Sequence, residues 1–113
     1  MTVRRGDVVL VDLNPVIGTE QAGVRPAVIL QIDRANQASP HTIIAPFTTR
    51  IRQPLLPSHA LVPAGIAGLT QDSVMLGEQI RVIDKRRIIR VLGHLGDQHM
   101  SAVEKAVSII LGL

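Results

Sequence analysis

A chain of 113 residues, 46% of them hydrophobic, has the length and apolar content of one globular domain, and we expect a single domain spanning residues 1–113. The absence of cysteine excludes disulfides and thiolate metal sites, and a single aromatic residue, Phe47, excludes base recognition mainly by aromatic stacking. The formal charge is +3, and ten of the twelve basic residues are arginine, whose planar guanidinium suits bidentate phosphate contacts, so the composition favours a nucleic-acid partner.

The first half of the chain predicts three strands separated by polar segments. The strands are expected at residues 5–13, 26–32 and 42–49. The second of them is nearly all apolar and is therefore expected to be buried on both faces. Residues 15–24 read as a loop, and residues 33–40 as a polar connector. In the third strand Pro46 cannot donate a hydrogen bond, which implies a sheet edge or a bulge just before Thr48.

The second half of the chain predicts three further strands and then a helix. These strands are expected at residues 59–63, 73–83 and 88–95. The strand at 73–83 carries Glu78, Gln79 and Arg81 at its polar positions. Residues 50–57 form a basic, proline-bearing segment, and residues 84–87 a charged or short helical turn.

From Asp97 the apolar period becomes helical. One stripe is made by Met100, Val103, Ala106, Val107, Ile110 and Leu111. Asp97 is expected to cap the start of this helix and Gly112 to end it. Short strands, tight turns and one terminal helix together predict a mainly β fold, a small twisted barrel.

Export, membrane insertion and metal binding have no signal in this sequence. The N-terminal MTVRRGD lacks the apolar segment of a signal peptide, and no apolar run reaches membrane-spanning length, so we expect a soluble, cytoplasmic protein. The four histidines are scattered, without HxH or HxxxH spacing, and no loop is rich in carboxylates. We therefore expect neither a metal nor another cofactor.

Arg25 stands between a polar, glycine-containing loop and an apolar strand. Its guanidinium is always charged, so at the edge of a buried strand it needs a carboxylate or a bound anion. Pro26 restricts the backbone of Arg25 to extended conformations, so the side chain leaves a rigid mount. Two interpretations are open at this point: an ion pair with Glu20 or Asp7, or half of an anion-binding site.

The polar side chains left on loops and strand ends suit one reaction that needs neither metal nor cofactor. They are Arg25, Thr48, Thr49, Glu20, Gln21, Ser73 and Gln79. The reaction is RNA cleavage in which the substrate's own 2′-OH attacks the neighbouring phosphate. Arg25 can neutralise the developing charge, and Thr48 can supply an oriented hydrogen bond. Glu20 is chemically easier as a base than arginine, unless substrate positioning supplies most of the catalysis.

Four blocks of the sequence together resemble the MazF/PemK family of toxin endoribonucleases from bacterial toxin–antitoxin pairs. The blocks are RRGDVVLVDLNPVIGTEQAGVRPAVIL at residues 4–30, PFTT at 46–49, LTQDSVMLGEQIRVIDKRRI at 69–88 and the closing helix that ends in LGL. The resemblance covers nearly the whole chain. It implies a strongly bent, SH3-like antiparallel β-barrel with a C-terminal helix, and a symmetric homodimer. It also implies an mRNA interferase: metal-independent, sequence-specific cleavage of single-stranded mRNA that inhibits translation and growth.

The same resemblance assigns residues to roles. The catalytic arginine of the family falls on Arg25 and its catalytic threonine on Thr48. RNA contacts fall on the first loop, at residues 17–21, and on the EQIR segment. The candidate RNA-binding residues are Thr19, Glu20, Gln21, Thr49, Ser73, Glu78 and Gln79. The loop varies among relatives, so the cleavage sequence is not implied.

Two other functions and one partner are also considered. A toxin of the same fold that binds DNA gyrase, as in the CcdB branch, relies on a C-terminal Trp-Gly-Ile ending, whereas this chain ends Leu111-Gly112-Leu113 and has no tryptophan. A nucleic-acid-binding barrel without activity is excluded less well by the sequence. The expected partner of the toxin is an antitoxin whose acidic, disordered tail folds across the groove at Arg25.

Overall fold

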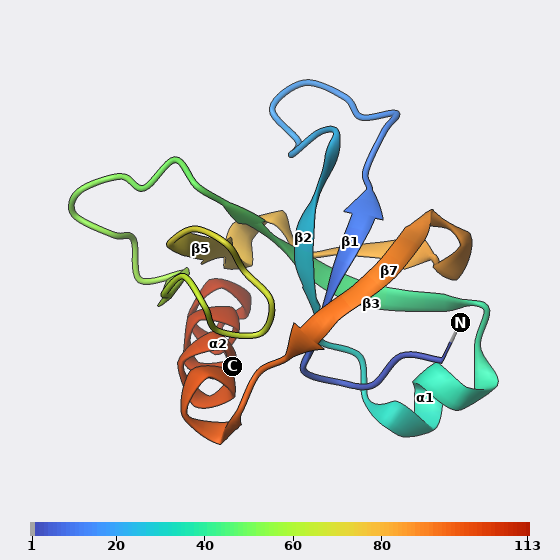
Figure 1. Ribbon diagram of the computed structural model, residues 1–113. Coiled ribbons are helices and arrows are strands. Elements are labelled where there is room, and N and C mark those ends of the chain that lie inside the picture. The colour runs from blue at the N-terminus through green and yellow to red at the C-terminus, as the bar shows by residue number, and fades with distance from the viewer. Residues whose placement is uncertain (1) are drawn as a thin grey trace.

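The computed structural model describes residues 2–113, and its elements are mainly antiparallel strands (Figure 1). In chain order these are β1 (Asp7–Asp12), β2 (Val24–Ile29), α1 (Asp33–Ala38), β3 (His41–Thr48), β4 (His59–Val62), β5 (Ser73–Leu76), the 3₁₀ turn η1 (Gly77–Gln79), β6 (Arg81–Asp84), the 3₁₀ turn η2 (Lys85–Arg87), β7 (Ile88–His94) and α2 (Asp97–Leu111). The strands predicted in the first half of the chain, and those predicted around β4 and β7, are present with bounds shifted by at most three residues.

β3 belongs to both halves of the sheet and produces its bend. Its first half pairs with β6, where Ile43 lies opposite Val82, and its last residues pair with β5, where Phe47 lies opposite Met75. On its other edge β3 pairs with β2, so the strand order is β4-β5-β3-β2-β1-β7. Figure 1 shows β3 crossing behind β2 and β1, and α2 packs against β4 and η1. The predicted mainly antiparallel, bent fold with a C-terminal helix is confirmed.

The sheet carries a hydrophobic core on each face. Val8 and Val28 belong to one core, which α2 closes with Met100, Val103 and Ala106. The other core holds Val3, Val9, Val11, Leu13, Ala27, Ile29, Ile44, Ile83 and Ile88. Neighbouring residues of one strand enter different cores because side chains alternate between the faces of a sheet. β2 is therefore buried on both faces over residues 27–29, as predicted.

The single strand predicted at residues 73–83 is wrong. The segment is divided into β5, η1 and β6, because β3 offers two separate pairing sites along one edge. At the break Gly77 donates its N–H to Ser58 O at 2.9 Å, and a Cβ at this position would lie 2.6 Å from the same oxygen. This close approach requires glycine. Glu78 and Gln79 consequently lie on a 3₁₀ turn and not on the polar face of a strand.

Pro46 lies inside a central strand, so the sheet edge or bulge predicted there is also wrong. Leu30 donates its N–H to Ile43 O at 2.8 Å, and antiparallel ladder bonds recur at every second residue, so the nitrogen of Pro46 points away from β2. On that side the pairing of β3 with β6 reaches Ile44, where β6 begins at Arg81, and the pairing of β3 with β5 covers Phe47 and Thr48. The missing N–H falls between the two partner strands and removes no ladder bond.

The polar connector predicted at residues 33–40 is instead the helix α1. Its buried residue is Asn36, whose side chain donates to Gln31 O at 2.8 Å and accepts from Thr42 Oγ1 at 2.8 Å. The helix turns a polar side chain toward the core, so the apolar period that marks a helix in sequence is missing here.

α2 differs from the predicted helix at its two ends. Gly96 occupies the N-cap and Asp97 is the first helical residue, so the predicted cap at Asp97 is wrong. Gly112 ends the helix in the left-handed region at φ +72°, as predicted. The apolar stripe is buried only as far as Ala106, and Ile110 and Leu111 are exposed. Within residues 2–113 no helix is long and apolar enough to cross a membrane.

Candidate active site

A groove of about 580 Å³ opens between the loop that joins β1 to β2 and the end of β3. We call residues 13–23 the first loop. The groove is lined by Glu20, Gln21, Ala22, Val24, Arg25, Pro26, Phe47, Thr48, Thr49 and Arg50. It therefore contains the two predicted catalytic residues and two of the three RNA-binding residues predicted on the first loop.

Arg25 and Thr48 are brought together by the pairing of β2 with β3. The pairing runs from Ile29 opposite Ile44 to Ala27 opposite Pro46, so Arg25 and Thr48 each lie two residues beyond its last pair. Both line the groove. Two residues distant in sequence thus line one wall of the groove.

Because Pro26 has no N–H, the carbonyl oxygen of Phe47 is free to accept a hydrogen bond from Arg25. The β2–β3 ladder would direct the N–H of residue 26 at Phe47 O, and proline has no N–H to give. Arg25 Nη1 donates to that oxygen at 3.2 Å, and Arg25 Nε donates to Ala22 O at 2.9 Å. These bonds use two of the five N–H donors of the guanidinium, and the other three remain for a bound anion.

Arg25 has no carboxylate in salt-bridge contact within the described part of the chain. Asp7 instead contacts His94 Nδ1 at 2.8 Å, and Glu20 Oε2 lies 3.9 Å from Arg81 Nη1. The structural ion pair considered from the sequence is therefore wrong. Burial lowers the pKa of Arg25, and the positive charge of Arg50 lowers that pKa further. Two guanidinium groups thus repel each other at one groove, which favours an anion between them.

Thr48 is oriented by the backbone of Arg50, two residues further along the chain. Its Oγ1 accepts a hydrogen bond from the N–H of Arg50 at 3.1 Å. Because the oxygen is used as an acceptor in this bond, the hydroxyl proton remains available as a donor. Thr49 is exposed and lines the same groove.

Ser73 lies in a neighbouring hollow and not in the groove itself. The hollow has a volume of about 270 Å³ and shares Pro26 and Thr49 with the groove. Ser73 is buried, and its Oγ donates to Gln71 O at 2.9 Å. Arg90, which is exposed, lines the same hollow.

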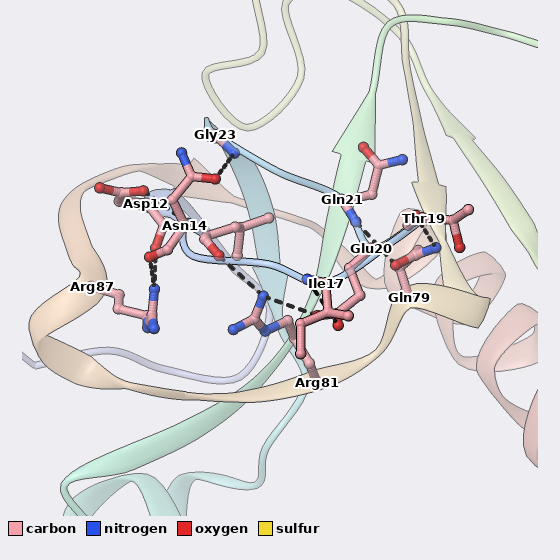
Figure 2. Close-up of polar contacts among 11 residues, drawn as sticks. Asp12, Asn14, Ile17, Thr19, Glu20, Gln21, Gly23, Gln79, Arg81 and Arg87 are labelled. Carbon is pink, nitrogen blue, oxygen red and sulfur yellow. Dashed lines mark hydrogen bonds and ion pairs between the residues drawn. The ribbon is translucent and has the colours of Figure 1, made fainter.

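Three predicted residues are tied to one another through the first loop. Gln79 Oε1 accepts from the N–H of Gln21 at 3.2 Å, and Gln79 Nε2 donates to Thr19 O at 3.5 Å. Thr19 is exposed and is not part of the groove wall. Glu20 Oε1 accepts from the N–H of Ile17 at 3.3 Å, which closes the turn at the tip. Figure 2 shows Gln79 lying against the loop at Thr19 and Gln21.

Glu78 bonds the segment at the start of β4. It accepts hydrogen bonds from Ser58 Oγ at 3.1 Å and from His59 Nε2 at 3.1 Å. His59 Nδ1 accepts from the N–H of Leu56, so we assign the ring proton to Nε2. Desolvation raises the pKa of Glu78, but hydrogen bonds from its own N–H, His59 and Ser58 outweigh it, and the net pKa lies below the ordinary value.

Sequence reasoning missed Arg50 as a residue of this site. Its position two residues after Thr48, in the basic segment at 50–57, could have indicated that it lies near the catalytic threonine. The carbonyls of Ala22 and Phe47 had no signal, because a backbone acceptor can belong to any residue type. Among residues 2–113 there is also no group of three His, Asp or Glu side chains placed to hold a metal ion.

A bent antiparallel sheet with a C-terminal helix and an arginine–threonine groove beside its first loop agrees with one family. The chain belongs to the PemK-like, MazF-like toxins of type II toxin–antitoxin systems, whose sequence profile matches residues 4–111. The resemblance inferred from the four sequence blocks is thereby confirmed.

Individual relatives are similar over almost their full length. The chain is 46% identical over 113 residues to endoribonuclease EndoA of Bacillus subtilis (strain 168). The matched region covers 100% of this chain and 97% of EndoA. Its fold is similar to that of MazF from Deinococcus radiodurans, with a TM-score of 0.84, 24% identity and coverage of 100% and 99% of the two chains. A mycobacterial endoribonuclease solved in complex with its cognate antitoxin gives a TM-score of 0.82 and 20% identity, with coverage of 98% and 96%. These two structural likenesses show the fold.

Proposed function

We propose that this protein is an endoribonuclease that cleaves single-stranded mRNA at a short preferred sequence, as the toxin of a toxin–antitoxin pair that inhibits translation and growth. Family membership and the 46% identity to an endoribonuclease support the class of activity. One observation of the site carries the proposal furthest: Arg25 is held by two backbone carbonyls, without a carboxylate partner in residues 2–113, beside the free hydroxyl proton of Thr48.

The reaction is an internal transfer of the phosphate. The 2′-oxygen of the ribose forms a bond to the adjacent phosphorus, and the bond from phosphorus to the 5′-oxygen of the next nucleotide breaks. The 2′-OH gives up its proton, and the leaving 5′-oxygen takes one. The products are a 2′,3′-cyclic phosphate and a 5′-OH, and no metal or cofactor takes part.

Arg25 and Thr48 act on the phosphate in this scheme. The free N–H groups of Arg25 bind two non-bridging oxygens and neutralise the charge that grows in the pentacoordinate state. Thr48 donates a hydrogen bond that orients the same group. Glu20 is the carboxylate on the groove wall and accepts the 2′ proton, because an arginine holds its own proton too tightly to serve as a base.

The remaining predicted residues contact or organise the RNA. Gln21 and Thr49 line the groove and contact nucleotides beside the cleaved bond, and Thr19 contacts RNA from the exposed loop tip. Ser73 serves a nucleotide in the neighbouring hollow. On η1, Gln79 bonds the first loop at Gln21, and Glu78 anchors the segment of Ser58 and His59.

The proposal includes two protein partners. A second copy of this chain completes a symmetric homodimer, and a small antitoxin lays an acidic, disordered tail across the Arg25 groove. The antitoxin is supported by the family description and by the mycobacterial relative solved with its cognate antitoxin. Acidic side chains suit a groove in which Arg25 and Arg50 lie together.

Incubation of the purified protein with a long single-stranded RNA tests the function. We expect cleavage that is unchanged in excess chelator, leaves 2′,3′-cyclic phosphate and 5′-OH ends, and fails when the scissile nucleotide carries 2′-deoxyribose. The matched control is Arg25→Ala, which should not cut. Chelator-sensitive cleavage, or wild-type cleavage by Arg25→Ala, contradicts the mechanism, and binding of RNA without cleavage indicates a barrel without activity.

A further inference from the structure

The tip of the first loop is not held by hydrophobic packing. Leu13 and Val16 at its start pack on the core, but residues 17–20 are all exposed, and Ile17 is 82% exposed. Gly18 and Gly23 adopt positive φ, and a side chain built on either would meet open space. A segment with so few buried contacts is easily displaced. Polar contacts must therefore set where Glu20 and Gln21 stand on the groove wall.

Arg87 of η2 donates to Asn14 O at the start of the loop, and the contacts near its tip come from side chains of η1 and β6. Arg81 Nη1 donates to Leu13 O at 3.2 Å and lies 3.9 Å from Glu20 Oε2. Gln79 bonds the backbone at Gln21 and Thr19, as described above. In Figure 2 Arg81 approaches the loop from below, and Gln79 lies at the right beside Thr19 and Gln21. The two side chains thus contact the loop at separate points.

The base of this arrangement is rigid. Arg81 is paired with Ile44 in the β3–β6 ladder, and its side chain is only 24% exposed. The turn that carries Gln79 is fixed by Gly77 against Ser58 O. Glu78 of the same turn bonds Ser58 and His59 at the start of β4. Residues 78–81 thus bond both the first loop and the segment at Ser58 and His59 from one fixed segment.

We propose that Arg81 and Gln79 are positioning residues that hold the first loop so that Glu20 and Gln21 face the RNA in the Arg25 groove. Neither side chain lines the groove, so both act through the loop. That the loop faces RNA rests on the proposed function. That Arg81 and Gln79 fix the position of the loop does not depend on that function.

The chain offers a matched control in Arg86. This arginine is 90% exposed and pairs with Asp84 at 3.0 Å, two residues away, without touching the first loop. Arg86→Ala removes the same positive charge as Arg81→Ala from the same part of the surface. A general loss of attraction for RNA would therefore affect both variants equally.

The first measurement is hydrogen exchange, which does not depend on activity. We expect peptides covering residues 14–23 to exchange faster in Arg81→Ala and in Gln79→Ala than in wild type, with the core strands unchanged, and Arg86→Ala to match wild type. Unchanged exchange in residues 14–23 in both variants overturns the proposal. If wild type cuts no RNA, the proposed function fails, and this measurement still decides whether Arg81 and Gln79 hold the loop.

The second measurement is kcat/KM on RNA. Arg81→Ala and Gln79→Ala should each lower it about tenfold, the size expected for one lost hydrogen bond at a charged or buried polar group, and Arg81→Lys should recover part of the loss. Arg86→Ala should stay within about twofold of wild type, as expected for an exposed surface substitution. In a Glu20→Ala background Arg81→Ala should cost little more, because the two residues act together. Equal losses for Arg81→Ala and Arg86→Ala, or full additivity with Glu20→Ala, overturn the proposal.

Discussion

Arg25 owes its orientation to the main chain. Pro26 removes an N–H from the β2–β3 ladder, and the guanidinium takes the place of that donor at Phe47 O. A second carbonyl, Ala22 O, fixes Nε. An arginine anchored in this way keeps its charge uncompensated and its remaining donors preorganised, which is the condition for strong stabilisation of a transition state.

Arg25→Lys tests this anchoring. An ammonium keeps the charge, but it cannot bond both carbonyls and still grip two phosphate oxygens, so kcat should fall about 10²- to 10³-fold. The measurement is RNA cleavage under saturating substrate, with thermal unfolding of both proteins as a control for folding. A lysine variant that cuts at the wild-type rate would show that charge alone is sufficient.

Thr48→Val tests the hydroxyl next to it. Valine is nearly the same shape, so the fold should be retained, while kcat falls by a smaller factor, about tenfold for the loss of one hydrogen bond. Thr48→Ser, which restores a hydroxyl, should recover most of the rate. Wild-type kcat in the valine variant would remove Thr48 from the mechanism.

Glu78 provides a pH-dependent contribution to stability. Its folded pKa is lowered, so its stabilisation is present above the unfolded pKa of about 4.3 and is lost as the pH falls through the folded pKa. Glu78→Gln should therefore lower the Tm at pH 7, and the difference from wild type should shrink in acid. Parallel Tm curves for the two proteins between pH 7 and about pH 3 would contradict this assignment.

The break between β5 and β6 is the element that contacts both the first loop and the segment at Ser58 and His59. It depends on Gly77, where an added Cβ would lie 2.6 Å from Ser58 O. Gly77→Ala must push the backbone of η1 away from the segment at Ser58, and it should lower the free energy of unfolding by about 1–3 kcal/mol. Urea denaturation measures this change. Gly96→Ala is the control, since a side chain there meets no atom within 4 Å, and a similar loss in both variants would refute the steric cause.

The whole molecule exposes several large aliphatic side chains, and exposed apolar patches of this kind are typical of protein–protein interfaces. They include Val82, Ile89, Val91, Ile109, Ile110, Leu111 and Leu113. Several belong to the last turn of α2 and to exposed strand positions, and we expect these surfaces to form the interface of the proposed homodimer.

The homodimer can be checked by size. One chain has a Cα radius of gyration of 12.9 Å, and a compact dimer should measure about 17 Å. Small-angle X-ray scattering and sedimentation at micromolar concentration should both report the larger particle. Ile110→Lys, which buries a charge if this turn lies at the interface, should shift the equilibrium toward monomer. Monomer alone at micromolar concentration would refute the dimer.

The sequence by itself determined the features that local pattern controls. Runs of β-branched and other apolar residues bounded by turn residues predicted β1, β2, β3 and β7, and the helical period from Asp97 predicted α2. Pro26 next to Arg25 indicated a rigidly mounted guanidinium. The long motif blocks indicated the family and brought Arg25 and Thr48 together as one candidate site.

Only the tertiary structure decided which groups each side chain meets. Local pattern does not specify that β3 changes partner from β6 to β5 at Pro46, so it predicted one strand where the chain makes β5, η1 and β6. For the same reason, local pattern did not predict that Gln79 and Arg81 contact the first loop. The choice between an ion pair and an anion site at Arg25 also depended on distant partners, because the carboxylates of Asp7 and Glu20 are taken by His94 and Arg81. Backbone carbonyls hold the arginine instead, and they leave no trace in the identity of the residues that bear them.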